Sequence, residues 1–214
     1  MMLDLKKLCE EYKIDVKGVV QVGTHRGQET DEFLTLAPDR ILLIEALPHL
    51  VKHLIELYKD KSQIKVVHCA ISNYNGKANF NVLSNEMSSS LLPLKKHAEV
   101  YPDIVKVREI EVPCMRLDSL MEKIGEKFAD YNFLDIDVQG AEGLVFEGAM
   151  NLLKHIEAIN VEVNHDELYE GCILEPDLTA LLKCNGFEKK TETNPYHYMW
   201  GDAFYVRNLK TVEN

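Results

Sequence analysis

The chain alternates between short, largely apolar runs and longer segments in which apolar residues recur every three or four positions. Residues 19–22, 40–45 and 64–70 are largely apolar, and apolar and polar residues do not alternate regularly in them, which is typical of strands covered on both faces. The segments between them, 29–36 and 48–58, have helical spacing. This order of strand, helix, strand, helix and strand predicts a parallel sheet with right-handed crossovers.

Between residues 75 and 115 the pattern changes. Asn75-Gly76 is typical of a hairpin turn, and apolar residues then alternate with polar ones, as in strands with one exposed face. We interpret residues 75–115 as an insertion beside a ligand crevice and not as a separate domain.

The pattern of buried strands and helices resumes after the insertion, and the whole of 1–214 is interpreted as one domain. Its N-terminal part predicts an amphipathic helix at 2–14. The remaining elements are expected, in order, as a helix at 117–124, a strand at 131–136, a helix at 140–156, a strand at 158–163, a helix at 176–183 and a closing strand pair at 187–191 and 203–207.

The amino-acid composition limits the kinds of partner and the cellular compartment that we expect for this protein. The formal net charge of −11 argues against nucleic acid or an anionic membrane surface as a partner, because both are bound through basic side chains. Five cysteines without C-x-x-C spacing indicate a reduced, cytoplasmic protein. The charged N-terminal segment does not resemble a signal peptide, and no apolar run is long enough for membrane insertion. A homo-oligomer stays open.

The turn after the first strand holds the first candidate ligand site. Gly23 allows the backbone to turn sharply, and Gly27 would let a ligand approach the start of the next helix. Glu45 ends the second strand, about twenty residues further on, at the separation typical of a carboxylate that binds ribose hydroxyls. Ala70 and Ile71, after the third strand, suit the face of an adenine ring or simply the core.

Two polar clusters follow the later strands. Asp135 and Asp137 occupy alternate positions, and so do Glu162 and Asn164, so each pair faces one way. Asp137, Glu162 and Asn164 could ligate a divalent cation such as Mg²⁺. Alternatively they could bind substrate hydroxyls, with Asp137 or His165 as the general base.

These residues resemble the FkbM family of S-adenosylmethionine-dependent methyltransferases along most of the chain. The resemblance rests on six blocks in order: VVQVGTHRGQET, LLIEALPHL, VVHCAISNYNGKANF, EVPCMRLDSL, FLDIDVQGAEGLVFEGA and INVEVN. It implies a Rossmann-like class I methyltransferase fold, an α/β three-layer sandwich whose mostly parallel sheet has an antiparallel C-terminal strand. The implied reaction is methyl transfer from S-adenosylmethionine to a hydroxyl, most often of a sugar or glycan, with a non-sugar small molecule or natural product as the alternative acceptor.

The resemblance also assigns roles. Asp137 would lie near the transferred methyl group, and by analogy with related enzymes Asp137, Glu162 and Asn164 would hold Mg²⁺. The cofactor would be bound by Gly23, Thr24, His25, Gly27, Gln28, Glu45, Ala46, Ala70, Ile71 and Asp135.

Two departures from the family pattern leave other functions open. Gln21 stands where the family often has Asp, and Gln139 where it has Glu, which gives some weight to a non-catalytic cofactor-binding module. A nicotinamide-dependent oxidoreductase is disfavoured, because its glycine fingerprint would require Gly at His25 and Gln28.

Overall fold

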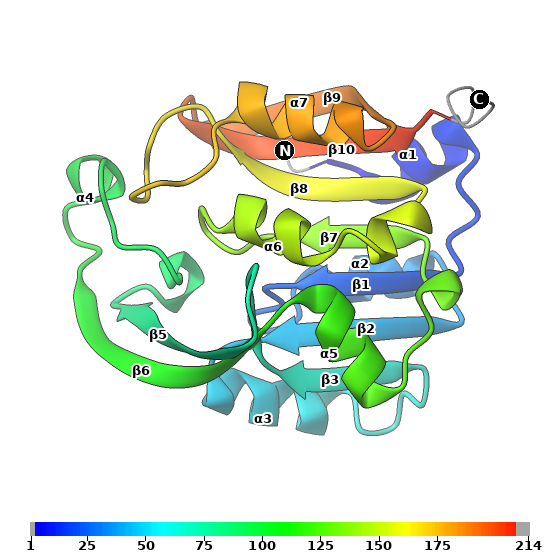
Figure 1. The fold of residues 1–214 in the computed structure, drawn as a ribbon, viewed down its shortest axis with the longest axis horizontal. Coiled ribbons are helices and arrows are strands. Elements are labelled where there is room, and N and C mark those ends of the chain that lie inside the picture. Colours follow the sequence, from blue (N-terminus) through cyan, green and yellow to red (C-terminus); the bar gives the residue numbers. More distant parts are fainter. Residues whose placement is uncertain (1–2, 209–214) are drawn as a thin grey trace.

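A seven-stranded sheet forms the centre of the protein in the computed structural model, which describes residues 3–208 (Figure 1). Its order is β3-β2-β1-β7-β8-β10-β9, and the first five of these strands are parallel. β10 pairs antiparallel with both β8 and β9, so the predicted mostly parallel sheet with an antiparallel C-terminal strand is confirmed. The strands are β1 (Gly18–Val22), β2 (Arg40–Glu45), β3 (Ile64–His68), β7 (Phe133–Ile136), β8 (Ala158–Asn164), β9 (Phe187–His197) and β10 (Trp200–Arg207).

Helices cover both faces of this sheet. Successive strand residues point to opposite sides, and here the side chains on both sides are apolar. Val19 packs with Phe33 and Leu54 on one face, whereas Val20 packs with Leu120 and other residues on the opposite face. The three-layer sandwich is therefore confirmed. The first face carries α1 (Leu5–Tyr12), α2 (Thr30–Thr35) and α3 (Pro48–Leu57), and the second carries α5 (Leu117–Ile124), α6 (Glu142–Gly148) and α7 (Glu175–Cys184).

A second, three-stranded sheet of order β4-β6-β5 lies on the side of the molecule where β1 and β2 end (Figure 1). The predicted strand at 64–70 divides between the two sheets, because β3 ends at His68 and Ala70 then pairs with Cys114 of the small sheet. This part of the chain contains β4 (Ala70–Ile71), β5 (Gly76–Leu83), the 3₁₀ helix η1 (Glu86–Ser88), α4 (His97–Val100) and β6 (Lys106–Met115).

The N-terminal helix is shorter than the predicted 2–14. Its first residue is Leu5, and the Asp4 carboxylate caps it by accepting the Lys7 N–H at 3.0 Å. Lys13 ends it in the left-handed conformation, with φ 57°. Met2 lies outside the described residues, as do 209–214, so a single domain over 1–214 stays a prediction.

The predicted helix at 140–156 is wrong in its second half. α6 ends at Gly148, where a Cβ atom would lie 2.3 Å from the backbone oxygen of Ser72. The Asp118 carboxylate then accepts the N–H groups of Asn151 and Leu152, at 2.8 and 3.0 Å, and caps the separate 3₁₀ helix η3 (Leu152–Lys154). The close packing at Gly148 and the cap by Asp118 together break the helix.

Among residues 3–208, no helix is both long and apolar enough to cross a membrane. All five cysteines are free thiols, and Cys184 alone of them is exposed. The cytoplasmic location inferred from them stays a prediction.

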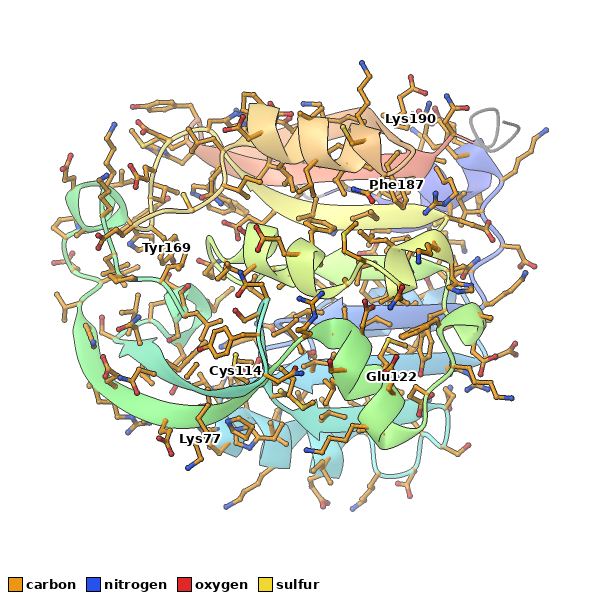
Figure 2. The ribbon with its side chains drawn as sticks, viewed as in Figure 1. Lys77, Cys114, Glu122, Tyr169, Phe187 and Lys190 are labelled. Carbon is orange, nitrogen blue, oxygen red and sulfur yellow. The ribbon has the colours of Figure 1, made fainter. Side chains whose placement is uncertain are left out.

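The cap by Asp118 predicts a measurable effect on stability. The variant Asp118→Ala leaves the buried N–H group of Leu152 and the part-buried one of Asn151 without their acceptor, so we expect the free energy of unfolding to fall by about 1–3 kcal/mol. Urea denaturation measures it. Glu122→Ala, an exposed position on the same helix (Figure 2), is the matched control and should change the free energy by less than about 0.5 kcal/mol. Equal unfolding curves for the two variants would contradict this role.

Candidate functional site

A pocket opens at the carboxyl ends of β1, β2 and β7, beneath the small sheet and η1. Its empty volume, including space open to solvent, is about 540 Å³, within the range of small-molecule sites. Seven of the residues predicted to form a site line it: Gly23, His25, Glu45, Ala46, Ala70, Ile71 and Asp137. The pocket therefore brings together residues that are far apart in the sequence.

Gly23 allows the ends of β1 and β7 to meet. Its φ is +89°, and a Cβ atom there would lie 1.7 Å from the backbone oxygen of Asp137. The Asp137 N–H in turn donates to the carbonyl of Val22 at 3.0 Å. No side chain fits between these strands, so glycine at this position places Asp137 beside the turn.

Glu45 holds the turn from the other side. Its carboxylate oxygens accept the N–H groups of His25 and Leu47, both at 2.8 Å. Burial raises the pKa of Glu45, and the N–H groups of Leu47 and His25 oppose that rise. Because each carboxylate oxygen has a second lone pair, Glu45 retains acceptor capacity toward a ligand hydroxyl.

Gly27 and Thr24 do not line the pocket. A Cβ atom on Gly27 would lie 2.7 Å from the Tyr58 hydroxyl, which donates to the Gly27 carbonyl at 3.1 Å. The Thr24 hydroxyl donates to the carbonyl of Ile44 at 3.4 Å. Both residues therefore shape the turn, and the space beside Gly27 is filled by Tyr58.

Gln28 supports His25 from outside the pocket. Its Nε2 lies 2.9 Å from His25 Nδ1, which fixes the ring next to the turn. His25 has a φ of +50°, and burial lowers the pKa of its imidazole, so the ring is held neutral at pH 7.

Asp135 is buried and does not line the pocket. One of its oxygens accepts Asn160 Nδ2 at 2.8 Å, and the other has no hydrogen-bond partner among the described residues. Gln21 is also buried and faces α2, since its amide oxygen accepts the Thr30 hydroxyl at 2.8 Å and its nitrogen reaches Glu29 at 3.3 Å. The position where the family often has Asp is thus a packing position here.

Asp137, which lines the pocket, has three acidic neighbours: Glu142, Glu162 and Asp202. Burial raises the pKa of Glu142 and of Asp202 to about 7, and the nearby charge of Asp137 adds to both shifts. Glu162 is fully buried, and its pKa is raised well above the usual value by burial and by Asp137. Gln139 Nε2 lies 2.7 Å from Asp137 Oδ1 and 2.5 Å from Glu162 Oε2. One amide thus serves both carboxylates.

The magnesium hypothesis gains no support from this geometry. Among residues 3–208, no group of three or more His, Cys, Asp or Glu side chains is arranged to hold a metal ion. The amide of Gln139 stands between Asp137 and Glu162, and Asn164 turns its nitrogen toward Glu142 at 3.5 Å. As arranged here, these side chains are engaged with one another's amides and carboxylates and do not form a cage for the ion.

His165 is not brought to the pocket. Its Nε2 lies 2.5 Å from Glu192 Oε1 on β9, and its backbone N–H donates to Met199. Asp137 is the only one of the two predicted bases that lines the pocket.

Sequence reasoning missed several residues that complete the site. Phe80, Glu86 and Met87 form its wall on the side of the small sheet. Alternation had indicated Phe80 as a buried strand residue, but the loop around η1 carries no signal of a ligand. Tyr169 was also missed: its hydroxyl donates to the amide oxygen of Gln139, which lines the pocket.

Comparison with known proteins gives one family. Residues 21–189 match the methyltransferase FkbM domain. The 2-O-methyltransferase NoeI of Sinorhizobium fredii is 27% identical over 161 residues, which cover 72% of this chain and 65% of the relative. The chain thus spans a little under two thirds of that curated relative.

Solved structures agree on the fold. The FkbM methyltransferase of Methylobacillus flagellatus superposes with a TM-score of 0.57 at 13% identity, over 90% of this chain and 44% of that one. A Streptococcus pneumoniae protein described as a putative tRNA (m1A22) methyltransferase, in complex with S-adenosyl-L-methionine, superposes with a TM-score of 0.50 at 11% identity, over 97% of this chain and 73% of that one. With the family match over residues 21–189, the chain belongs to the FkbM methyltransferase family.

Proposed function

We propose that this protein is an S-adenosylmethionine-dependent O-methyltransferase whose acceptor is a hydroxyl of a sugar or glycan. The observation that carries the proposal is the polarity of the pocket. Ala70 and Ile71 give an apolar wall, Glu45 gives a hydroxyl acceptor, and Asp137 gives an acidic end. This order matches the adenine, the ribose and the cationic sulfonium of the methyl donor.

The charge of the site favours such a ligand. Asp137 is half-buried at the pocket, and Glu142, Glu162 and Asp202 lie around it. Buried carboxyl groups with raised pKa values regain their ionised form when a cation binds beside them. The donor carries a positive sulfur before transfer and none afterwards, so the acidic end favours binding of the donor over binding of its demethylated product.

S-adenosylmethionine, held by Glu45, Ala70 and Ile71, would supply a methyl group activated by the positive sulfur for transfer to the acceptor oxygen. The protein must orient the acceptor and take its proton. Asp137 is the carboxylate positioned for this, because it lines the pocket while Glu142 and Glu162 are fully buried. The proton of the acceptor hydroxyl passes to Asp137 in this mechanism.

Aromatic side chains beyond β8 support a sugar as the acceptor. Trp200 pairs with Asn164 at the carboxyl end of β8, and Tyr196 stacks on it with ring centroids 5.5 Å apart. Tyr196 and Tyr198 are 67% and 69% exposed. Exposed rings of this kind suit the C–H faces of a pyranose ring. The relative named as a 2-O-methyltransferase supports oxygen as the acceptor atom.

The ribose role of Glu45 is tested by Glu45→Gln. The amide keeps one acceptor and loses the negative charge, so we expect the affinity for S-adenosylmethionine, measured by calorimetry, to fall roughly tenfold. Glu56→Gln, on an exposed turn of α3, should bind like the wild type. Thermal unfolding of both variants identifies any loss of fold, and equal affinities in folded variants would argue against the assignment.

The acidic end predicts a pH dependence of cofactor choice. Glu142 and Asp202, with pKa values of about 7, are largely neutral at pH 6 and largely ionised at pH 8. The ratio of affinities for S-adenosylmethionine over S-adenosylhomocysteine should therefore rise several-fold from pH 6 to pH 8. Both ligands carry the same amino acid group, so the ratio isolates the sulfonium charge. A ratio independent of pH would contradict the electrostatic interpretation.

The reaction itself is tested by incubation with methyl-labelled S-adenosylmethionine and a panel of free sugars, glycosides and non-sugar alcohols. We expect label in a sugar hydroxyl, detected by mass spectrometry, and at least tenfold less of it with Asp137→Asn. Label only in non-sugar alcohols would favour the alternative acceptor class. Cofactor binding without any labelled product would favour a non-catalytic cofactor-binding module.

A further inference from the structure

Gln139 has an unusual backbone conformation for its residue type. Its φ is +58°, in the left-handed region that residues with a side chain rarely adopt. This conformation aims the amide between Asp137 and Glu162, and its nitrogen donates to both, at 2.7 and 2.5 Å. Both hydrogens of the amide are thus used on carboxylates.

Tyr169 holds the other end of this amide. The Tyr169 hydroxyl lies 2.9 Å from Gln139 Oε1 and 3.0 Å from the carbonyl oxygen of Ser88. Ser88 cannot donate through its carbonyl, so the hydroxyl hydrogen is shared between two acceptors. The carboxylates of Asp137 and Glu162 need a donor, so the amide nitrogen of Gln139 faces them and its oxygen is left toward the tyrosine hydroxyl.

Packing holds Tyr169 itself in place. It is fully buried, and the His97 ring lies 5.4 Å away between centroids. A Cβ atom on Gly140 would come within 2.8 Å of the tyrosine side chain, so the glycine after Gln139 makes room for it. Figure 2 shows Tyr169 on the side of the molecule where the parallel strands end.

The charges around Asp137 show why a donor is needed there. Glu142 on α6, Glu162 on β8 and Asp202 on β10 each have an electrostatic interaction with Asp137. Glu29 and Asp135 interact with it in the same way. His25 is the one basic group among these neighbours, and burial disfavours its charged form. Among these mostly acidic groups, the Gln139 amide is a neutral donor that hydrogen-bonds to the Asp137 side chain.

We propose that Gln139 and Tyr169 are positioning residues that hold the Asp137 carboxylate in its orientation against the positively charged end of the cofactor. This inference rests on the proposed function. Gln139 lines the pocket and Tyr169 does not, and neither takes the acceptor's proton in this proposal. Tyr169 orients the amide, the amide orients and stabilises the carboxylate, and the carboxylate contacts the ligand.

Two variants separate this role from general stability. Gln139→Asn keeps an amide and tolerates the left-handed conformation, but it is one methylene shorter and cannot span both carboxylates. Tyr169→Phe keeps the buried ring and removes only the hydroxyl. Tyr74→Phe, which removes a half-exposed hydroxyl 3.5 Å from the Lys77 carbonyl, is the matched control.

The experiment measures calorimetric affinities of the full chain for three ligands: S-adenosylmethionine, sinefungin, which has an ammonium in place of the methylated sulfur, and uncharged S-adenosylhomocysteine. We expect Gln139→Asn to weaken the two cationic ligands roughly tenfold and Tyr169→Phe roughly threefold, with less than about twofold change for S-adenosylhomocysteine. Tyr74→Phe should leave all three affinities unchanged.

Equal losses for all three ligands, or no loss, would overturn the positioning role while leaving the proposed function intact. A wild-type protein that binds none of the three would overturn the proposed function and this inference with it. Thermal unfolding midpoints within a few degrees of the wild type establish that each variant is folded.

Discussion

The close approach of the Gly23 backbone to the carbonyl of Asp137 is the constraint on which the site depends. Because a Cβ atom at Gly23 would lie 1.7 Å from that oxygen, the turn after β1 and the turn after β7 are in direct contact. The first turn is also anchored to β2 through Glu45, which accepts the His25 N–H. The ends of three neighbouring strands are thus fixed relative to one another by the backbone contact at Gly23 and by the Glu45 carboxylate. The side chains at these strand ends are therefore held in fixed positions around the pocket.

Electrostatics adds a second level to this frame. The parallel strands direct several carboxylates to one edge of the sheet, where burial raises the pKa values of Glu142, Glu162 and Asp202. Like charges held together away from water are costly, and the raised pKa values express that cost as a preference for the neutral carboxyl groups. The cationic cofactor that we propose would reverse this preference.

Much of this architecture could be predicted from the sequence, because it follows from local patterns. Unbroken apolar runs marked the buried strands, and Gly23, Glu45 and Asp137 stood out as polar or flexible residues at strand ends. The break after Gly148 was not predictable, because it depends on the backbone of Ser72 and the side chain of Asp118, both distant in sequence. The same holds for Tyr169, whose hydroxyl matters only through the fold that carries it to Gln139.

The two sheets are joined with almost no slack. The chain leaves β3 at His68 and enters β4 at Ala70, with the buried Cys69 alone between them. A connection of one residue leaves no room for an inserted residue. The pocket wall formed by Ala70 and Ile71 is therefore held at a fixed distance from the end of β3. The segment around η1 also lines the pocket, and eight residues separate it from α4. A change in chain length can therefore be accommodated after η1 far more easily than between the two sheets, so the shape of the pocket is adjustable on one side and fixed on the other.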